Sequence, residues 1–233
     1  MQYNYLKISA LVFGVTPFLG LILNTAGQVL LARVISQFGV LFLVYGVYSY
    51  ATINEGYLKN EGMKIAALFL VFWIFNIVGV LIDSLFPLEI PESASAEKKQ
   101  ALASLAVFTG MLAVLFYTIF LYTAIKFTGW FEQVALQVNI RGTTAMKWLG
   151  VVYTIAATSI FMGKTLLYSL VMAETELETA DVSSILVGGL VLSGAGSLLI
   201  LGGFSLQIVT GLILYSRLSG AKTKKIYTYK LSS

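Results

Sequence analysis

The chain has 233 residues, of which 58% are hydrophobic and only 11% are charged. A soluble domain usually carries about 25% charged residues, so this composition excludes an ordinary soluble protein and also a disordered one. The absence of Cys excludes disulfides, thiolate metal sites and iron–sulfur ligands, and the absence of His excludes imidazole metal ligands and histidine bases. Uncharged stretches of roughly 18 or more residues indicate transmembrane helices instead.

Charged and polar residues divide the chain into apolar segments. The first segment contains Pro17, where a kink is expected, and the polar stretch 27–37 after it is interpreted as a short interfacial turn. The clearest loop is 87–100, which combines prolines, serines and charges. The sequence therefore predicts an all-α, polytopic membrane protein with a single domain over 1–233, about six transmembrane helices and a basic tail at 217–233. The predicted spans are 6–26, 36–53, 64–86, 101–125, 148–173 and 182–216.

The last apolar segment, 182–216, allows two interpretations. One helix of that length would measure about 52 Å, whereas the hydrocarbon core of a bilayer is roughly 30 Å thick. Two full spans with a turn would be cramped. We predict a single span, tilted or broken by glycine, because of the distribution of charge described next.

Six spans place both termini on one side of the membrane. That side carries few acids and most of the basic residues, namely Lys7, Lys59, Lys64, Lys126, Arg141, Lys147, Arg217, Lys222, Lys224, Lys225 and Lys230. The positive-inside rule then predicts a multi-pass protein of the cell membrane with both termini in the cytoplasm. Seven spans would export the lysine-rich tail and rank second. The net charge of +4 follows from this asymmetry, so no nucleic-acid partner is expected.

The segment after the fourth span has its own periodicity. Apolar residues recur at helical spacing on one face, and two of them are aromatic residues suited to the headgroup boundary. We therefore predict an interfacial amphipathic helix over 127–139, which either docks on the membrane surface or contacts a cytoplasmic partner. The residues of its apolar face are Phe127, Trp130, Phe131, Val134 and Val138.

Four polar residues lie inside or at the ends of the predicted spans. Lys164 lies in the fifth span and Asp83 ends the third on the same membrane side, which suggests an intramembrane ion pair. Snorkelling, contact with a partner subunit and a solute path are the other interpretations of Lys164. Asn76 and Gln207 lie at similar depth in different spans, so they could form an interhelical hydrogen bond.

Two further features concern packing and lipids. Small residues form a stripe along the last span that would pack against another helix or a second subunit: Ser184, Gly188, Gly189, Ser193, Gly196 and Ser197. The tail carries Lys222, Lys224 and Lys225, which would contact anionic lipids.

Two apolar segments carry a resemblance. The strings TPFLGLIL (Thr16–Leu23) and WLGVVYTIAATSIFMG (Trp148–Gly163), followed by a glycine-rich last block, resemble a family of small, uncharacterised archaeal multi-spanning membrane proteins. The resemblance covers most of the chain loosely, and the stretch 28–37 and the tail depart from it. It implies a polytopic helical fold and no particular chemistry.

The same residues limit the functions to be expected. Without His, Cys or a buried carboxylate, an enzyme or a proton-coupled transporter is hard to assemble, and no cofactor or metal is expected. The sequence favours a non-catalytic structural or accessory subunit of a larger membrane complex. The alternative is a small-solute or ion channel or uniporter. The expected partners are membrane lipids and either other membrane subunits or further copies of the chain.

Overall fold

The computed structural model describes residues 3–85, 95–172 and 179–221. Within these ranges there is no strand, so the predicted all-α fold is confirmed. All six helices are long and apolar enough to cross a membrane, and the chain is a polytopic helical membrane protein. The helices are α1 (Asn4–Thr25), α2 (Val29–Thr52), α3 (Gly56–Leu85), α4 (Ala96–Gln137), α5 (Ala145–Met172) and α6 (Thr179–Ser219).

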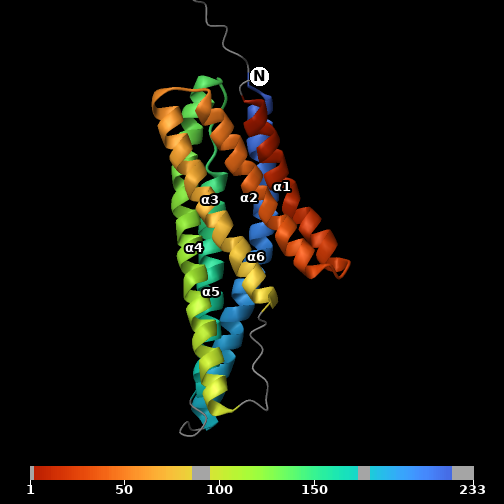
Figure 1. Ribbon diagram of the computed structural model, residues 1–233, viewed down its shortest axis with the longest axis vertical. Helices are drawn as coiled ribbons and strands as arrows, with labels where there is room; N and C mark the ends of the chain where they lie inside the picture. The colour runs from red at the N-terminus through yellow and green to blue at the C-terminus, as the bar shows by residue number, and fades with distance from the viewer. Residues whose placement is uncertain (1–2, 86–94, 173–178, 222–233) are drawn as a thin grey trace, which may run out of the picture.

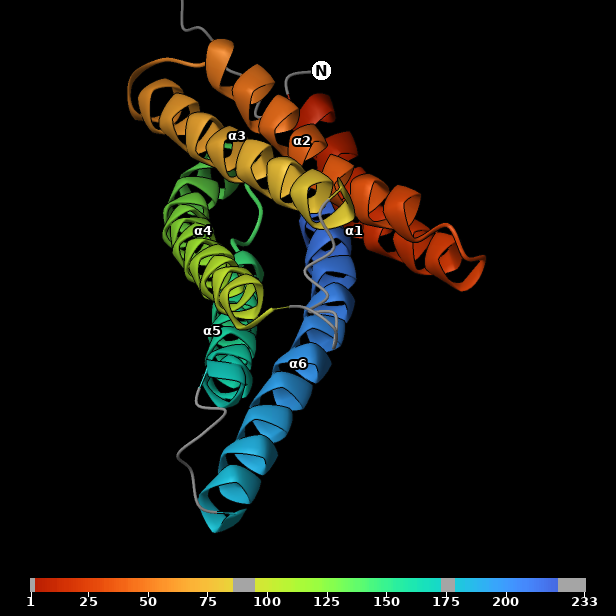
Figure 2. The same cartoon turned by 60° about the horizontal axis from the view of Figure 1, so that its bottom comes forward.

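The helices form a ring in chain order. Each helix packs against the next along the chain, and α6 returns to pack against α1 (Figures 1 and 2). The start of α1 and the end of α6 are joined directly, since the Tyr3 hydroxyl donates a hydrogen bond to the Ala221 carbonyl over 3.1 Å. The Lys7 ammonium also lies 4.9 Å from the centre of the Tyr215 ring. We call this arrangement the six-helix ring.

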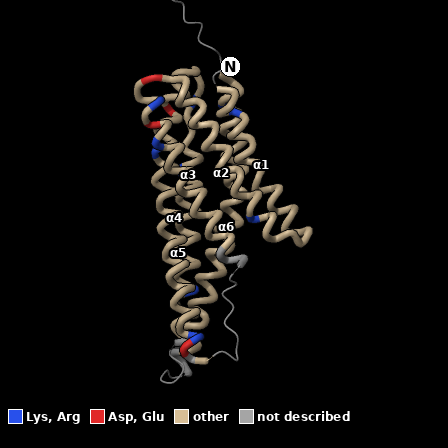
Figure 3. Tube along the Cα trace, viewed as in Figure 1, with Lys and Arg blue, Asp and Glu red and all other residues tan. Residues whose placement is uncertain are grey.

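The ring has two ends, which different connections form. The start of α1, the end of α6 and the α2–α3 and α4–α5 connections share what we call the terminal end (Figure 1). Side chains tie these connections together: the Tyr50 hydroxyl donates to Gln137 over 2.6 Å, and the Gln137 amide donates to Asn54 over 3.0 Å. We call the opposite end, with the α1–α2 turn, the distal end. Charged residues gather mainly toward the two ends (Figure 3).

Short connections explain where several helices stop. Gly27 ends the α1–α2 turn with a φ of +79°, and Gly56 begins α3 with a φ of +59°. Glycine adopts such left-handed angles without the penalty that a Cβ brings. Asn139, with a φ of 53°, has the same role after α4, and asparagine is among the few other residues that tolerate it.

The prediction of an interfacial turn at 27–37 is wrong. α2 already begins at Val29, and Arg33, Ser36 and Gln37 all lie within it. These polar residues are tolerated in the helix because they line a cavity inside the ring. Ser36 also donates a hydrogen bond to the Ala32 carbonyl over 2.8 Å, which satisfies its hydroxyl within the helix.

The prediction of a separate interfacial helix at 127–139 is also wrong. α4 runs without a break from Ala96 to Gln137. The apolar face predicted to lie at the membrane surface is buried in the protein, with Trp130 and Phe131 at 0% exposure. A 3.6-residue period identifies one apolar face but not what covers it, and here α2 and α3 cover it. Phe127, Val134 and Val138 are buried with them.

The segment 182–216 forms one continuous helix, as the single-span interpretation expects. α6 has 41 residues and α4 has 42, so each measures about 62 Å. The α1–α2 hairpin is shorter, at 22 and 24 residues. α4, α5 and α6 therefore extend beyond the tip of this hairpin at the distal end (Figure 1).

Close approach of backbones closes the ring between α1 and α6. A Cβ on Gly14 would lie 3.0 Å from the Gly211 Cα, and a Cβ on Gly211 would lie 2.7 Å from the Ala10 carbonyl oxygen. Only glycine permits this crossing. Glycines of α2 pack in the same way on α1, with Gly39 against Phe13 and Gly46 against Ser9.

Candidate functional site

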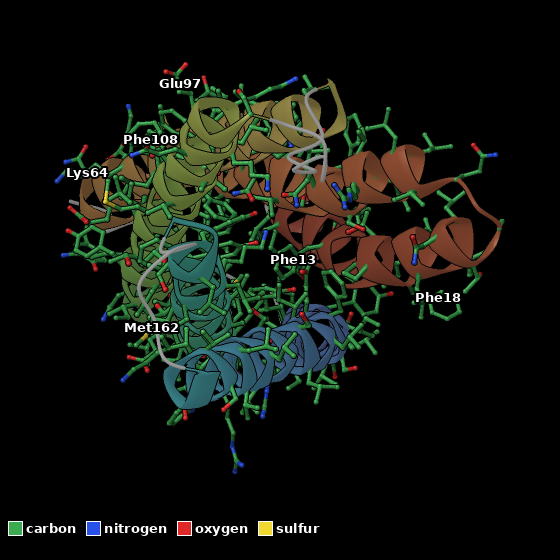
Figure 4. The ribbon with its side chains drawn as sticks, turned by 90° about the horizontal axis from the view of Figure 1, so that it is seen from below. Phe13, Phe18, Lys64, Glu97, Phe108 and Met162 are labelled. Carbon is green, nitrogen blue, oxygen red and sulfur yellow. The ribbon has the colours of Figure 1, made fainter. Side chains whose placement is uncertain are left out.

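A cavity of about 340 Å³ lies inside the six-helix ring. Every helix contributes to its lining, from α1 (Phe13) to α6 (Gln207), so the cavity exists only because the ring closes. Figure 4 views the ring from its distal end and shows Phe13 pointing inward, while Phe18, Phe108 and Met162 point outward.

The cavity opens toward the distal end. Its lining there includes Leu21 and Leu201, which are 51% and 55% exposed, together with the exposed residues Asn24 and Arg33. At the other end of the lining, Tyr153 is 7% exposed. The gradient of exposure along the lining defines a mouth and a closed end.

A chain of hydrogen bonds crosses the closed end of the cavity. The Tyr153 hydroxyl donates to the Gln207 Oε1 over 2.9 Å, and the Gln207 Nε2 donates to the Phe13 carbonyl over 3.0 Å. The chain joins α5, α6 and α1, and Gln207 is only 6% exposed. In an apolar environment such partners must come from the protein, because no water replaces them.

Aromatic side chains fill the ring between the cavity and the terminal end. Phe72 and Phe120 lie with ring centres 4.7 Å apart, and Phe69 lies 6.0 Å from Phe127. The Trp130 indole N–H donates to the Leu58 carbonyl over 2.9 Å, which fixes the layer to the start of α3. We call this layer the aromatic plug, and it consists of Phe69, Phe72, Phe120, Phe127, Trp130 and Phe131.

Polar groups gather at the cavity mouth, on the distal part of the α1–α2 hairpin. They are Asn24 of α1 and Arg33, Ser36 and Gln37 of α2. The sequence signalled them as a polar interruption, but their place inside a helix and beside a cavity depends on tertiary structure. An apolar, aromatic interior with a polar and basic mouth is the arrangement that suits a small amphiphilic molecule.

The predicted hydrogen bond between Asn76 and Gln207 is not formed. Asn76 donates instead to the Phe72 carbonyl of its own helix over 3.0 Å, and Gln207 bonds Tyr153 and Phe13. The two amides lie on α3 and α6, which are not neighbours in the ring. Similar depth in the membrane was therefore an insufficient criterion for contact.

The structure separates the remaining predicted residues from the cavity. Lys164 is exposed on α5 and forms no ion pair with any described side chain, while the side chain of Asp83 lies outside the described residues. Lys222, Lys224 and Lys225 of the tail lie outside them too. Among the described residues, no group of three or more His, Cys, Asp and Glu side chains could hold a metal ion.

The small-residue stripe of α6 divides between two environments. Gly189, Ser193 and Gly196 face α5, where a Cβ on Gly163 would lie 2.7 Å from the Gly189 carbonyl oxygen. A Cβ on Gly196 would lie 2.9 Å from the Ala156 carbonyl oxygen. The other members lie toward the outer surface: Ser184 and Ser197 are exposed and Gly188 is half-buried.

Comparison with known proteins identifies no relative of the chain. No family model, no curated protein and no solved structure matches the chain.

Proposed function

We propose that the protein is a non-catalytic membrane protein that binds a small amphiphilic solute in the cavity of the six-helix ring. The observation that carries the proposal is the cavity itself, which all six helices line and the aromatic plug closes. Aromatic side chains such as Phe204 would cover the apolar part of the solute, and Asn24, Arg33 and Gln37 would meet its polar part. A channel or uniporter would require the plug to move.

A fluorescent amphiphile tests this proposal. Anilinonaphthalene sulfonate combines apolar rings with one anionic group, and the protein in nanodiscs should bind it saturably. Ile200→Trp would fill part of the cavity and should weaken binding by at least about tenfold, a loss of about 1.4 kcal/mol. Val191→Trp, on the exposed side of the same helix, should leave binding unchanged. Equal fluorescence from empty nanodiscs would contradict the proposal.

We further propose that the terminal end faces the cytoplasm. Lys7, Lys59, Arg141 and Arg217 belong to this end of the ring, and cytoplasmic segments are enriched in such residues. The cavity mouth would then face the opposite side. A reporter enzyme that works only in the cytoplasm should be active when it is fused after the C-terminal residue. If instead a reporter that works only outside the cytoplasm is active at the same position, the assignment is reversed.

A second proposal, that the chain is a subunit of a larger membrane complex or a homo-oligomer, is favoured by the outer surface of α6. Val187, Val191 and Leu198 are 59–70% exposed, and a Cβ on Gly194 or Gly202 would meet nothing within 4 Å. Such a surface could accept another helix at close range. Gentle extraction followed by mass spectrometry of the intact assembly should find a stoichiometric partner or further copies. A monomer would contradict this second proposal and leave the first untouched.

A further inference from the structure

A second concave site lies on the terminal end, away from the ring cavity. It is a groove of about 840 Å³ between the α4–α5 connection and the last turns of α6. The connection contributes Asn139, Arg141 and Thr143 to one wall. α6 contributes Ser216 and Arg217 to the other.

The charge of this groove is of one sign. Arg141 and Arg217 come from opposite walls, and no acidic residue is among the described residues that line it. Glu132 of α4 lies beside Gly142 of the connection, where a Cβ on Gly142 would be 2.9 Å from its Cγ, but it is not among the lining residues. Arginine presents several fixed N–H donors and matches phosphate oxygens in pairs.

The connection that carries Arg141 is held in place by its backbone. Asn139 has a left-handed φ of 53°, and the Ile140 N–H donates to the Ala135 carbonyl over 2.9 Å. The Thr143 hydroxyl accepts a hydrogen bond from the Ala145 N–H over 3.2 Å. The wall is therefore formed before a ligand arrives, which lowers the entropic cost of binding.

The floor of the groove is apolar and continues along α6. Val209 and Leu212 line it and are 47% and 48% exposed. A free anion would gain nothing from this surface, whereas the upper part of an acyl chain would cover it. Two arginines at the terminal end would meet the phosphate of a phospholipid, and the apolar surface of α6 beside them would meet its acyl chain.

We propose that this groove binds an anionic phospholipid, with its phosphate between Arg141 and Arg217 and an acyl chain along Val209 and Leu212. The residues differ from the tail lysines that the sequence singled out, and the site does not depend on the ring cavity.

Lipid retention by the full-length protein tests the proposal. The protein, extracted in mild detergent, is titrated with phosphatidylglycerol or phosphatidylcholine, and bound lipid is counted by native mass spectrometry. Phosphatidylglycerol should bind with about tenfold or greater preference. The double variant Arg141→Gln with Arg217→Gln should lose that preference. The control, Lys59→Gln with Lys147→Gln, removes the same charge from exposed positions of the terminal end outside the groove and should keep it.

Two further arms complete the test. Inorganic phosphate should not displace the lipid at equal concentration, because it lacks the acyl chain; displacement would show a site for free phosphate and overturn the proposal. Leu212→Asn should weaken retention of phosphatidylglycerol without changing the melting temperature. If the groove variant and the control variant lose the preference for phosphatidylglycerol equally, that preference comes from general surface charge. This result would also overturn the proposal.

Discussion

At the residue scale, the contribution of a buried amide to stability depends on its hydrogen-bond partner more than on its depth in the membrane. Gln207 joins three helices through Tyr153 and the Phe13 carbonyl, whereas Asn76 satisfies its amide within α3. Both amides lie in apolar segments and look alike in the sequence. Because only Gln207 of the two makes hydrogen bonds between helices, its removal should weaken the ring more than removal of Asn76.

We expect Gln207→Leu to lower the free energy of unfolding by about 0.5–1.5 kcal/mol, since interhelical hydrogen bonds in membranes are worth about that much. Asn76→Leu is the matched control and should change it by less than about 0.5 kcal/mol, because its hydrogen bond stays within one helix. Reversible unfolding in mixed micelles measures both. A larger cost for Asn76→Leu would contradict the assignment.

At the element scale, two glycines of α6 have opposite surroundings. A Cβ on Gly211 would meet the Gly14 backbone at the α1–α6 crossing, whereas a Cβ on Gly202 would meet nothing within 4 Å. Both glycines sit in one apolar helix, where the intrinsic cost of glycine is the same. A difference in stability between alanine variants at these two glycines would therefore come from the α1–α6 crossing that closes the ring.

Gly211→Ala should therefore destabilise the protein by about 1–3 kcal/mol, through a forced shift of packed backbone. Gly202→Ala should be neutral or stabilising by up to about 1 kcal/mol, because alanine is the better helix former. Thermal melts of the two variants in the same detergent give the comparison. Equal melting temperatures would mean that α1 and α6 do not cross at these residues.

Tryptophan fluorescence distinguishes the two interpretations of the apolar face at 127–139, one in which it lies at the membrane surface and one in which it is buried in the protein. Trp130 is 0% exposed and Trp148 is 58% exposed. In variants that keep one tryptophan, with Phe at the others, brominated lipids should quench Trp148 fluorescence strongly and Trp130 fluorescence weakly. Strong quenching of Trp130 would restore the interfacial helix at 127–139.

At the scale of the whole molecule, composition and charge predicted the six helices and the common end at which α1 begins and α6 finishes. These features depend on local hydrophobicity and on counts of lysine and arginine, which a sequence displays directly. The start of α2 and the end of α4 escaped prediction, because side chains that face a ring interior have the same polarity pattern as those that face an interface. The cavity was not predictable, since its lining comes from all six helices at once.

The ring cavity is open at the distal end and closed at the terminal end, and this arrangement can be tested directly. The chain has no cysteine, so single cysteines can be introduced without a background signal. Phe204→Cys and Gln37→Cys line the cavity, and Phe69→Cys lies in the aromatic plug. The measurement is labelling with a membrane-impermeant maleimide, applied to intact cells and to inverted membranes. We expect the two cavity cysteines to react only from the distal side and the plug cysteine to react from neither side. Reaction of Phe204→Cys from both sides, or from neither, would contradict it.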